Sequence, residues 1–344
     1  MKFKLKSVLA FATCLLAFTA CSTDENEIVP VNDNPKEEAI VVSLNMGGDG
    51  VVTSEAETRG TATNDIYGIN VYYDKESDGT IDDVYAYGLF NNKEDMTITL
   101  LTRHVYRFEC SLVKNGANTL FYGQAFSNKY SGYCFPFQTS SSHSTMVENK
   151  FNIGTGVYLS GMKSGAAHLS NVASPSATNA DSYASISRFY GETDNYTPVE
   201  GGQVDIFLKR TVFGAKFVVS GMAEGTLTTT CGTFWTKTVT ADEEGAAIIY
   251  SYPDVYDCWQ NDSDHEVTLT LNYVSDRGRQ WNFDKTQQIT FKRNTLTTVN
   301  INVDPDLSSA TTTLTAEDFG DDNNIDLYIN ASGLIDIWVN PNEE

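Results

Sequence analysis

The side chains that could do chemistry in this chain are scattered along it. Ser160 and Lys163 have the spacing at which a lysine can activate a serine nucleophile, provided that both lie on one helical turn. Their surroundings are rich in glycine and strand-forming residues, so we expect strand or loop here and no catalytic pair. The four histidines lack the spacing of metal ligands, and no pair of carboxylates stands out as an acid and a base. The sequence therefore predicts no enzyme, no metal site and no cofactor.

An acidic segment imitates the start of a calcium-binding loop. Asp74, Glu76 and Asp78 alternate along it, and Gly79 takes the sixth position. The twelfth position is Tyr85, where such a loop has a bidentate glutamate. The segment therefore predicts a solvated hairpin turn rather than a cation site.

The N-terminus has the composition of a leader. Three lysines precede an apolar run over 8–16 that is too short to span a membrane, and small residues stand before Cys21. The pattern resembles a bacterial lipoprotein signal over 1–20, in which Cys21 is lipidated and becomes the first residue. It implies an outer-membrane lipoprotein precursor at the cell surface, with an ordinary secretory leader as the alternative. The acidic run 22–27 resembles an export tag and also suits a solvated tether.

Four cysteines remain beyond the leader and Cys21. An even number outside the cytoplasm indicates disulfides, and no C-x-x-C pattern points to redox or zinc chemistry. We favour Cys110–Cys134 and Cys231–Cys258, one bridge in each half of the chain, because separate domains rarely share bridges. Four free thiols in the core are the alternative.

Composition limits the partners. The chain has 344 residues and a net charge of −22, which becomes −25 when the leader and its three lysines are removed. Such a charge disfavours nucleic acid and anionic membrane surfaces as partners. The length indicates two domains, and 41% hydrophobic residues are enough to build their cores.

Short segments rich in Val, Ile, Thr, Tyr and Phe, separated by turn signals, predict an all-β fold of two Greek-key β-sandwiches. The expected strands cover 66–73, 83–90, 96–101, 104–113, 120–125, 204–219, 246–250, 267–274, 281–291 and 296–303. Residues 128–200 are polar and predict long loops with one or two strands. We place the domains at 60–203 and 204–344, with the boundary near Gly201-Gly202.

A further strand is expected at 39–46, ahead of these domains. Ile40, Val42, Leu44 and Met46 share one face, and a glycine-rich break follows before Arg59. A strand tethered by a segment that a protease can cut is a removable element of a core. We therefore assign 21–59 as a tether and removable first strand, because a sheet that lacks a strand accepts one from another chain.

The C-terminal segment has the pattern of a donor strand pair. Ile325, Leu327 and Ile329 alternate with polar residues, and Ile335, Ile337 and Val339 do so after a turn. The inward-facing pattern resembles that of 39–46. A hairpin packed on its own domain is the alternative interpretation.

Three segments together carry a resemblance to a family. They are Phe207-Leu208-Lys209-Arg210-Thr211-Val212-Phe213-Gly214-Ala215-Lys216-Phe217-Val218-Val219, Glu57-Thr58-Arg59-Gly60 and Ile66-Tyr67-Gly68-Ile69-Asn70-Val71-Tyr72. With the leader, they resemble the fimbrillin family of lipoprotein precursors of surface pili. The resemblance implies two transthyretin-like domains, cleavage between Arg59 and Gly60, loss of the first strand, and polymerisation with other pilus subunits by strand exchange, in support of adhesion to an unknown ligand.

Two alternatives stay open: an anchoring subunit that remains uncut, and a glycan-binding surface lipoprotein. The second would use aromatic side chains as a stacking platform, although such residues more often fill sandwich cores. The candidates are Tyr130, Tyr133, Phe135, Phe137, Trp235, Tyr250, Tyr252, Tyr256 and Trp259.

Overall fold

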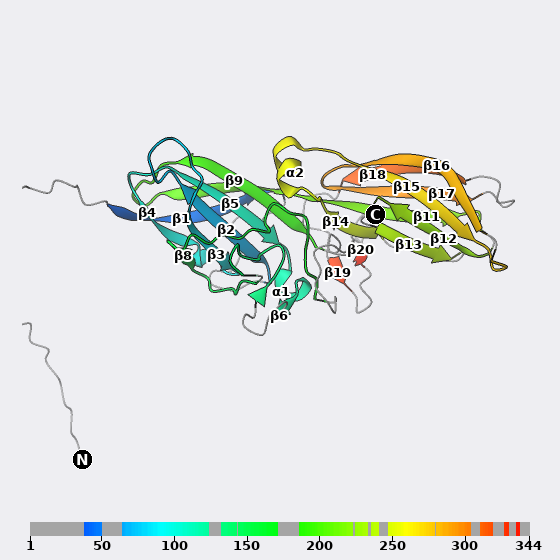
Figure 1. Cartoon of the computed structure of the whole chain (residues 1–344), viewed down its shortest axis with the longest axis horizontal. Coiled ribbons are helices and arrows are strands. Elements are labelled where there is room, and N and C mark those ends of the chain that lie inside the picture. Colours follow the sequence, from blue (N-terminus) through cyan, green and yellow to red (C-terminus); the bar gives the residue numbers. More distant parts are fainter. Residues whose placement is uncertain are drawn as a thin grey trace, which may run out of the picture. The chain divides into compact units, whose positions relative to one another are not determined.

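The structure is a computed structural model (Figure 1). It describes residues 38–49, 64–123, 132–142, 144–170, 186–222, 224–232, 235–240, 247–278, 280–303, 310–318, 327–329 and 335–337. Among these residues, no helix is long and apolar enough to cross a membrane. The secondary structure is almost entirely strand, which confirms the predicted all-β class.

Eight strands form the first sheet, in the order β4-β1-β10-β9-β5-β2-β3-β8. Their bounds are β1 Ala39–Gly48, β2 Ile66–Tyr73, β3 Asp83–Phe90, β4 Thr97–Leu101, β5 Tyr106–Val113, β8 Phe151–Ile153, β9 Arg188–Tyr196 and β10 Gln203–Arg210. The pairings between these strands are antiparallel except that of β1 with β10.

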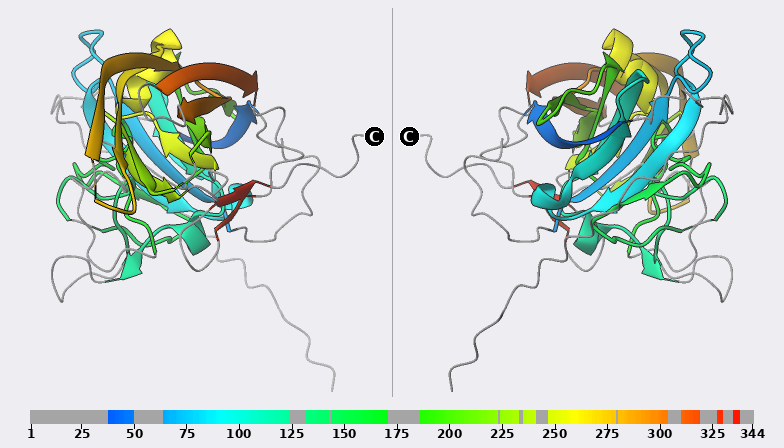
Figure 2. Two further views of the ribbon diagram at one scale, coloured as in Figure 1. Left: turned by 90° about the vertical axis from the view of Figure 1, so that its right-hand side faces the viewer. Right: turned by 90° about the vertical axis from the view of Figure 1, so that its left-hand side faces the viewer.

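The first sheet curves around one core. The core cluster takes apolar side chains from β1, β4 and β10 at one end of the strand order and from β2, β3 and β5 nearer the other. Tyr85 of β3 donates its hydroxyl to the carbonyl oxygen of Thr99 in β4 at 2.7 Å, which links the two ends. Figure 2 shows these strands, coloured blue to green, bending around a common interior.

A second cluster lies on the outer face of β2 and β5, because side chains alternate between the faces of a strand. Ile66 and Val113 contribute to it from the sheet, and Phe137 and Leu159 cover them from the long segment between β5 and β9. That segment contains α1 Gly116–Thr119 and the short strands β6 Tyr122–Gly123 and β7 Gly132–Tyr133. Its loops agree with the loop region that the sequence predicts.

Two four-stranded sheets follow and enclose a separate core cluster. One has the order β14-β11-β17-β18, and the other β13-β12-β15-β16. Their strands are β11 Val212–Ser220, β12 Thr226–Cys231, β13 Trp235–Thr240, β14 Ala247–Ser251, β15 His265–Val274, β16 Gln280–Phe291, β17 Thr295–Val303 and β18 Ala310–Asp318. The helix α2 Val255–Asn261 connects β14 to β15 and lies beside β9 of the first sheet (Figure 1).

The segment expected as one strand over 204–219 is two strands in different sheets. β10 belongs to the first sheet and β11 to the later pair, so the chain passes from one sheet to the other at Thr211. The domain limits themselves stay a prediction. The acidic segment between β2 and β3 is a hairpin connection, as expected, and Asp74 accepts hydrogen bonds there from the backbone of Asp78 and Gly79.

The C-terminal segment contains the strands β19 Leu327–Ile329 and β20 Ile335–Ile337, which pair antiparallel with each other. β20 lies next to β14. Ile325 and Val339 lie outside the described residues. The hairpin is thus present, and the choice between donor and self-packed hairpin stays a prediction.

The favoured disulfides are not formed in the structure. All four cysteines are free, buried thiols, as in the alternative interpretation of the sequence. Cys110 points into the core of the first sheet, whereas Cys134 is next to Tyr133 of the outer cluster, so the sheet separates them. Cys231 and Cys258 line the same core without a bond.

Candidate functional site: the slot that holds the first strand

The strand expected to be removable lies between two partners. β1 pairs antiparallel with β4, where Val42 is opposite Ile98, and parallel with β10, where Leu44 is opposite Val204. Both edges of β1 are therefore hydrogen-bonded, and without it β4 and β10 would each present an open edge. We call the space between β4 and β10, with the core beneath it, the slot.

The side chains of β1 alternate as the sequence predicts. Val42, Leu44 and Met46 are 1%, 7% and 2% exposed and belong to the core cluster, and Ile40 packs partly against it. Val41 on the opposite face is 58% exposed. Burial of three such side chains stabilises the strand in the slot by about 5–9 kcal/mol, an upper bound because the unfolded reference is idealised.

Main-chain contacts fix both ends of β1 in the slot. The amide of Thr102 donates to the carbonyl of Glu38 at 2.9 Å, and the amide of Asp49 donates to the carbonyl of Leu208 at 3.0 Å. Gly48 has a φ of +128°, and a Cβ there would lie 2.0 Å from the Leu208 oxygen. Only glycine lets the backbones of β1 and β10 approach this closely.

Asp49, immediately after β1, enters a group of charged side chains at the end of the slot. Its Oδ2 is 2.5 Å from Nη1 of Arg293. Arg293 also donates from Nε to Asp262 at 2.8 Å, and Asp262 pairs with Lys209 of β10 at 2.9 Å. This chain of contacts joins β1 and β10 to α2's C-terminal end and to the connection between β16 and β17.

Arg293 and Asp262 stabilise each other in the ionised form. Burial alone would lower the pKa of Arg293, but hydrogen bonds and charge from Asp49 and Asp262 raise it above its ordinary value. The pKa of Asp262 is lowered, first by its hydrogen bond from Lys209 and then by Arg293. The contact of Asp49 with Arg293 is one that sequence reasoning missed, because 244 residues separate the two side chains.

Other residues predicted for this site lie outside the described residues. They are Cys21, Arg59 and Gly60. The last described residue after β1 is Asp49, and the next described segment begins at residue 64 with the approach to β2. Arg59 thus lies in the sequence between the strand in the slot and the rest of the sheet.

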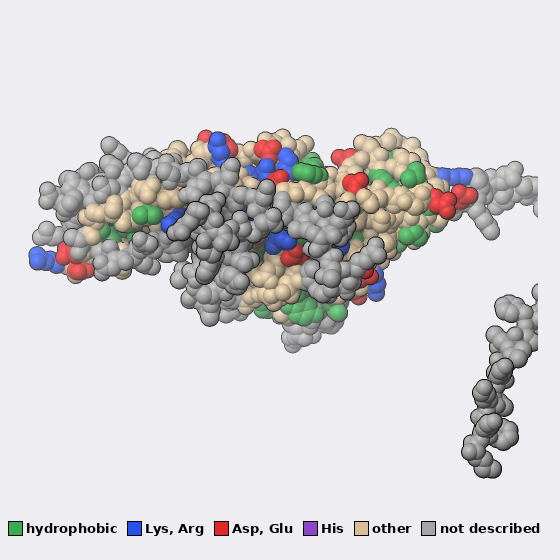
Figure 3. Space-filling view, turned by 180° about the vertical axis from the view of Figure 1, so that it is seen from behind, with side chains coloured by type: hydrophobic (Ala, Val, Ile, Leu, Met, Phe, Trp, Pro, Cys, Tyr) green, Lys and Arg blue, Asp and Glu red, His purple; other side chains and the backbone are tan. Residues whose placement is uncertain are grey.

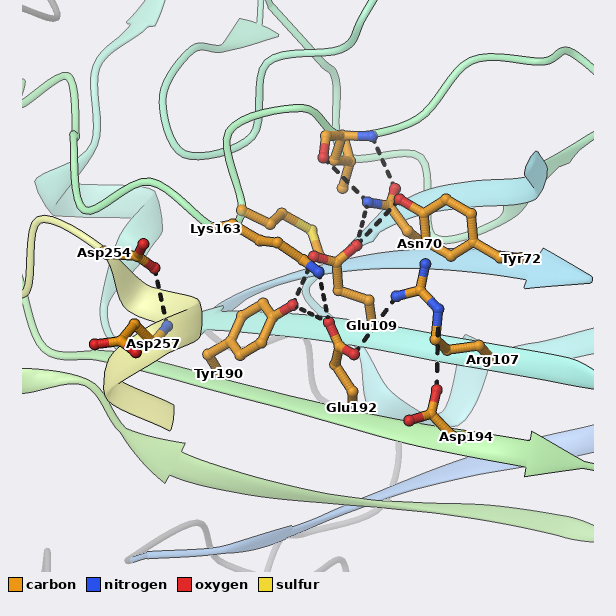
Figure 4. A network of polar contacts seen from close by, with 12 residues as sticks. Asn70, Tyr72, Arg107, Glu109, Lys163, Tyr190, Glu192, Asp194, Asp254 and Asp257 are labelled. Carbon is orange, nitrogen blue, oxygen red and sulfur yellow. Dashed lines mark hydrogen bonds and ion pairs between the residues drawn. The ribbon is translucent and has the colours of Figure 1, made fainter. Parts of the chain in front are cut away.

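A second polar site lies on the outer face of the first sheet (Figure 4). Glu109 of β5 is buried and accepts hydrogen bonds from Asn70 at 2.9 Å, Tyr72 at 3.2 Å and Tyr190 at 2.7 Å. Tyr190 also contacts Glu192, so the two carboxylates share one phenol. The pKa of Tyr190 is raised by burial first and by both carboxylates next.

This network fastens the long loop segment to the sheet. Asn70 accepts from the Leu159 amide at 2.8 Å, and buried Arg188 donates to the carbonyls of Met162 and Ser164. Burial lowers the pKa of Arg188 to about 9. The polar groups of the network bond to one another and to the loop backbone, so their role is to hold the loop on the sheet.

The serine and lysine singled out from the sequence have separate contacts. Lys163 pairs with Glu192 at 2.9 Å and lies over the ring of Tyr256 at 4.0 Å. Ser160 donates to the carbonyl of Gln138 at 3.5 Å. Lys163 therefore works as part of the loop's attachment to β9 and α2.

Several of the aromatic side chains named for a glycan platform pack inside the structure where it describes them. Tyr133, Phe137 and Tyr252 are buried. Tyr256 and Trp259 are partly buried and pack against Tyr190. On the face seen in Figure 3, acidic and basic side chains stand in mixed groups beside polar surface.

No family model matches the sequence, and no curated protein does so. Solved structures resemble it. A candidate cell adhesion protein from Bacteroides eggerthii has 11% identity and a TM-score of 0.40, covering 82% of this chain and 96% of that one. A fimbrial assembly protein from Parabacteroides distasonis has 10% identity and a TM-score of 0.32, covering 88% and 100%.

The tip fimbrial protein Mfa3 from Porphyromonas gingivalis has 10% identity and a TM-score of 0.29, covering 82% of this chain and 100% of that one. The names of these proteins agree with the fimbrillin resemblance of the sequence. Each of these TM-scores is below 0.5.

Proposed function

We propose that this chain is a structural subunit of a surface pilus, supports adhesion, and is assembled by strand exchange. It reaches the cell surface as a lipoprotein anchored through Cys21. A protease cuts after Arg59, β1 leaves the slot, and a strand of another subunit replaces it. The candidate donor of this chain is the segment that contains β19 and β20.

The observation that carries the proposal is the position of β1. This strand completes the first sheet and its core, yet it is the first strand among the described residues and is followed in the sequence by the segment that contains Arg59. A single cut there leaves β1 without a covalent link to the rest of the sheet. The remaining sheet has two open edges over an apolar slot, which favours capture of another strand.

The burial free energy of β1 is large enough to keep this strand in the slot until the chain is cut. Side-chain burial of about 5–9 kcal/mol is comparable with the whole stability of a small domain. While β1 is part of the chain, its return to the slot is intramolecular and any competing strand is disfavoured. After the cut, β1 and a donor compete as separate molecules.

The test is the fate of the precursor with a protease of trypsin-like specificity. The wild-type chain is expected to give material that begins at Gly60 and forms polymers. The Arg59→Ala variant is expected to stay monomeric under the same treatment. Polymers from the uncut variant, or a cut chain that keeps its own β1 and never exchanges it, would contradict strand exchange. A wild-type chain that the protease leaves uncut would favour the anchoring alternative.

A further inference from the structure

The end of the slot next to Gly48 is surrounded by basic side chains. Lys209 and Arg210 end β10, and Arg293 reaches the same place from the connection between β16 and β17. Arg293 donates to the carbonyl of Arg210 at 3.2 Å, so the two residues are in direct contact. We call these three residues the cationic end of the slot.

Asp49 neutralises part of this charge while β1 is in place. It pairs with Arg293, and its charge also favours the protonated form of Arg210, whose pKa burial lowers to about 10. Asp262 is the other carboxylate in this group. In the part of the uncut chain that the structure describes, Arg293 thus forms ion pairs with both Asp49 and Asp262.

Loss of β1 changes this balance. Asp49 lies in the piece that precedes Arg59, so it leaves with the strand. Arg293 then keeps its ion pair with Asp262 and has lost its ion pair with Asp49, at the end of an open apolar slot. Removing one partner of a partly buried ion pair leaves a charge that gains most from a new carboxylate.

We propose that the cationic end selects the strand that replaces β1, an inference that rests on the proposed function. The preferred occupant is a strand of a different pilus subunit with apolar residues at the positions of Val42, Leu44 and Met46. Glycine follows at the position of Gly48, and a carboxylate comes directly after it. The apolar residues fill the core, glycine permits the approach to Leu208, and the carboxylate pairs with Arg293.

This chain's own tail meets part of that description. Ile325, Leu327 and Ile329 repeat the apolar alternation of β1, and in the same register Gly333 takes the position of Gly48. Leu334 then stands where β1 has Asp49. In this register, a second copy of the chain would bring an apolar side chain to the cationic end, so a subunit with an acidic residue there is the better donor.

The experiment measures which strand the slot prefers. The full chain carries a site for a sequence-specific protease in place of residues 56–59, and it is cut with β1 in place. Fluorescent peptides of residues 38–50 then compete with β1, and their affinity is read from anisotropy. Five peptides are compared: the natural peptide, its Asp49→Asn form, its Glu38→Gln form, a tail peptide of residues 323–336, and the tail peptide with Leu334→Asp.

We expect Asp49→Asn to weaken binding about tenfold, the size of one charge-assisted hydrogen bond at a partly exposed site. Glu38→Gln removes the same charge at the other end of the strand and should change binding less than twofold. Leu334→Asp should tighten binding of the tail peptide about tenfold. In the Arg293→Gln protein, the effects of Asp49→Asn and of Leu334→Asp on peptide affinity should both disappear.

Several results would overturn the selection. They are equal affinities of the natural and Asp49→Asn peptides, an equal loss for Glu38→Gln, or persistence of the difference in the Arg293→Gln protein. The peptide comparison uses the natural slot, so it decides even if the Arg293→Gln chain does not fold. If the natural peptide never exchanges with β1, the proposed function fails and the selection fails with it, whereas exchange without preference refutes the selection alone.

Discussion

Two neighbouring valines of β1 provide a direct test of the slot. Val42 is 1% exposed and faces the core, and Val41 is 58% exposed and faces outward. Val42→Ala removes about two methylene equivalents from the core and leaves a small cavity, which costs about 2 kcal/mol. Val41→Ala is the same chemical change on the other face and should cost less than about 0.5 kcal/mol.

The assay follows the β1 fragment after the cut. The chain with the specific protease site is cleaved, and the retained fragment is measured by gel filtration and mass spectrometry over time. A loss of about 2 kcal/mol weakens retention roughly 30-fold, since each 1.4 kcal/mol is a factor of ten. Val42→Ala should therefore lose its fragment at concentrations at which Val41→Ala keeps it.

The comparison can refute the reasoning in two ways. Equal losses from Val41→Ala and Val42→Ala would show that the faces of β1 are not distinguished by burial. Full retention of both would show that the backbone ladder with β4 and β10, rather than the three core side chains, determines the stability of the complex. Circular dichroism of the uncut chains serves as the control for folding.

Three further predictions follow from single features. Gly48→Ala should weaken fragment retention more than Val41→Ala in the same assay, since a Cβ there meets the Leu208 oxygen at 2.0 Å. The four thiols are free, so a reductant should leave Tm unchanged, and they should react with a thiol reagent only on unfolding. Burial lowers the pKa of His168 and His265, so the unfolded chain binds protons first and denaturant stability should fall as pH drops below about 6.5, less steeply in His168→Gln.

Strands rich in apolar β-branched and aromatic residues could be predicted from the sequence. Ile66–Tyr73 and Asp83–Phe90 were expected with the bounds that β2 and β3 have. β12 and β13 were missed because threonine fills so many of their positions. Thr229 faces the core of β12 while Thr228 and Thr230 face outward, so polarity does not reveal the period of two.

Of the slot and its strand, only the strand itself could be predicted from the sequence. The apolar face of 39–46 follows from alternation, and the structure places Val42, Leu44 and Met46 in the core. The partners β4 and β10 do not follow from it, since strand order depends on long-range pairing that a local pattern does not contain. The disulfide prediction failed for the same reason: an even number of cysteines says nothing about the sheet that lies between Cys110 and Cys134.

The slot lies where the first sheet meets the rest of the chain, and this affects what strand exchange can do. β10 pairs with β1 and then continues through Thr211 into β11 of the next sheet. Arg293 joins the two sets of sheets, because it contacts both Asp49 and the end of β10. A strand in the slot whose carboxylate pairs with Arg293 therefore connects the two sets of sheets and also fills the core. A strand without that carboxylate fills the core only. In the proposed exchange, strands of similar hydrophobicity thus differ in how firmly they hold the two sets of sheets together.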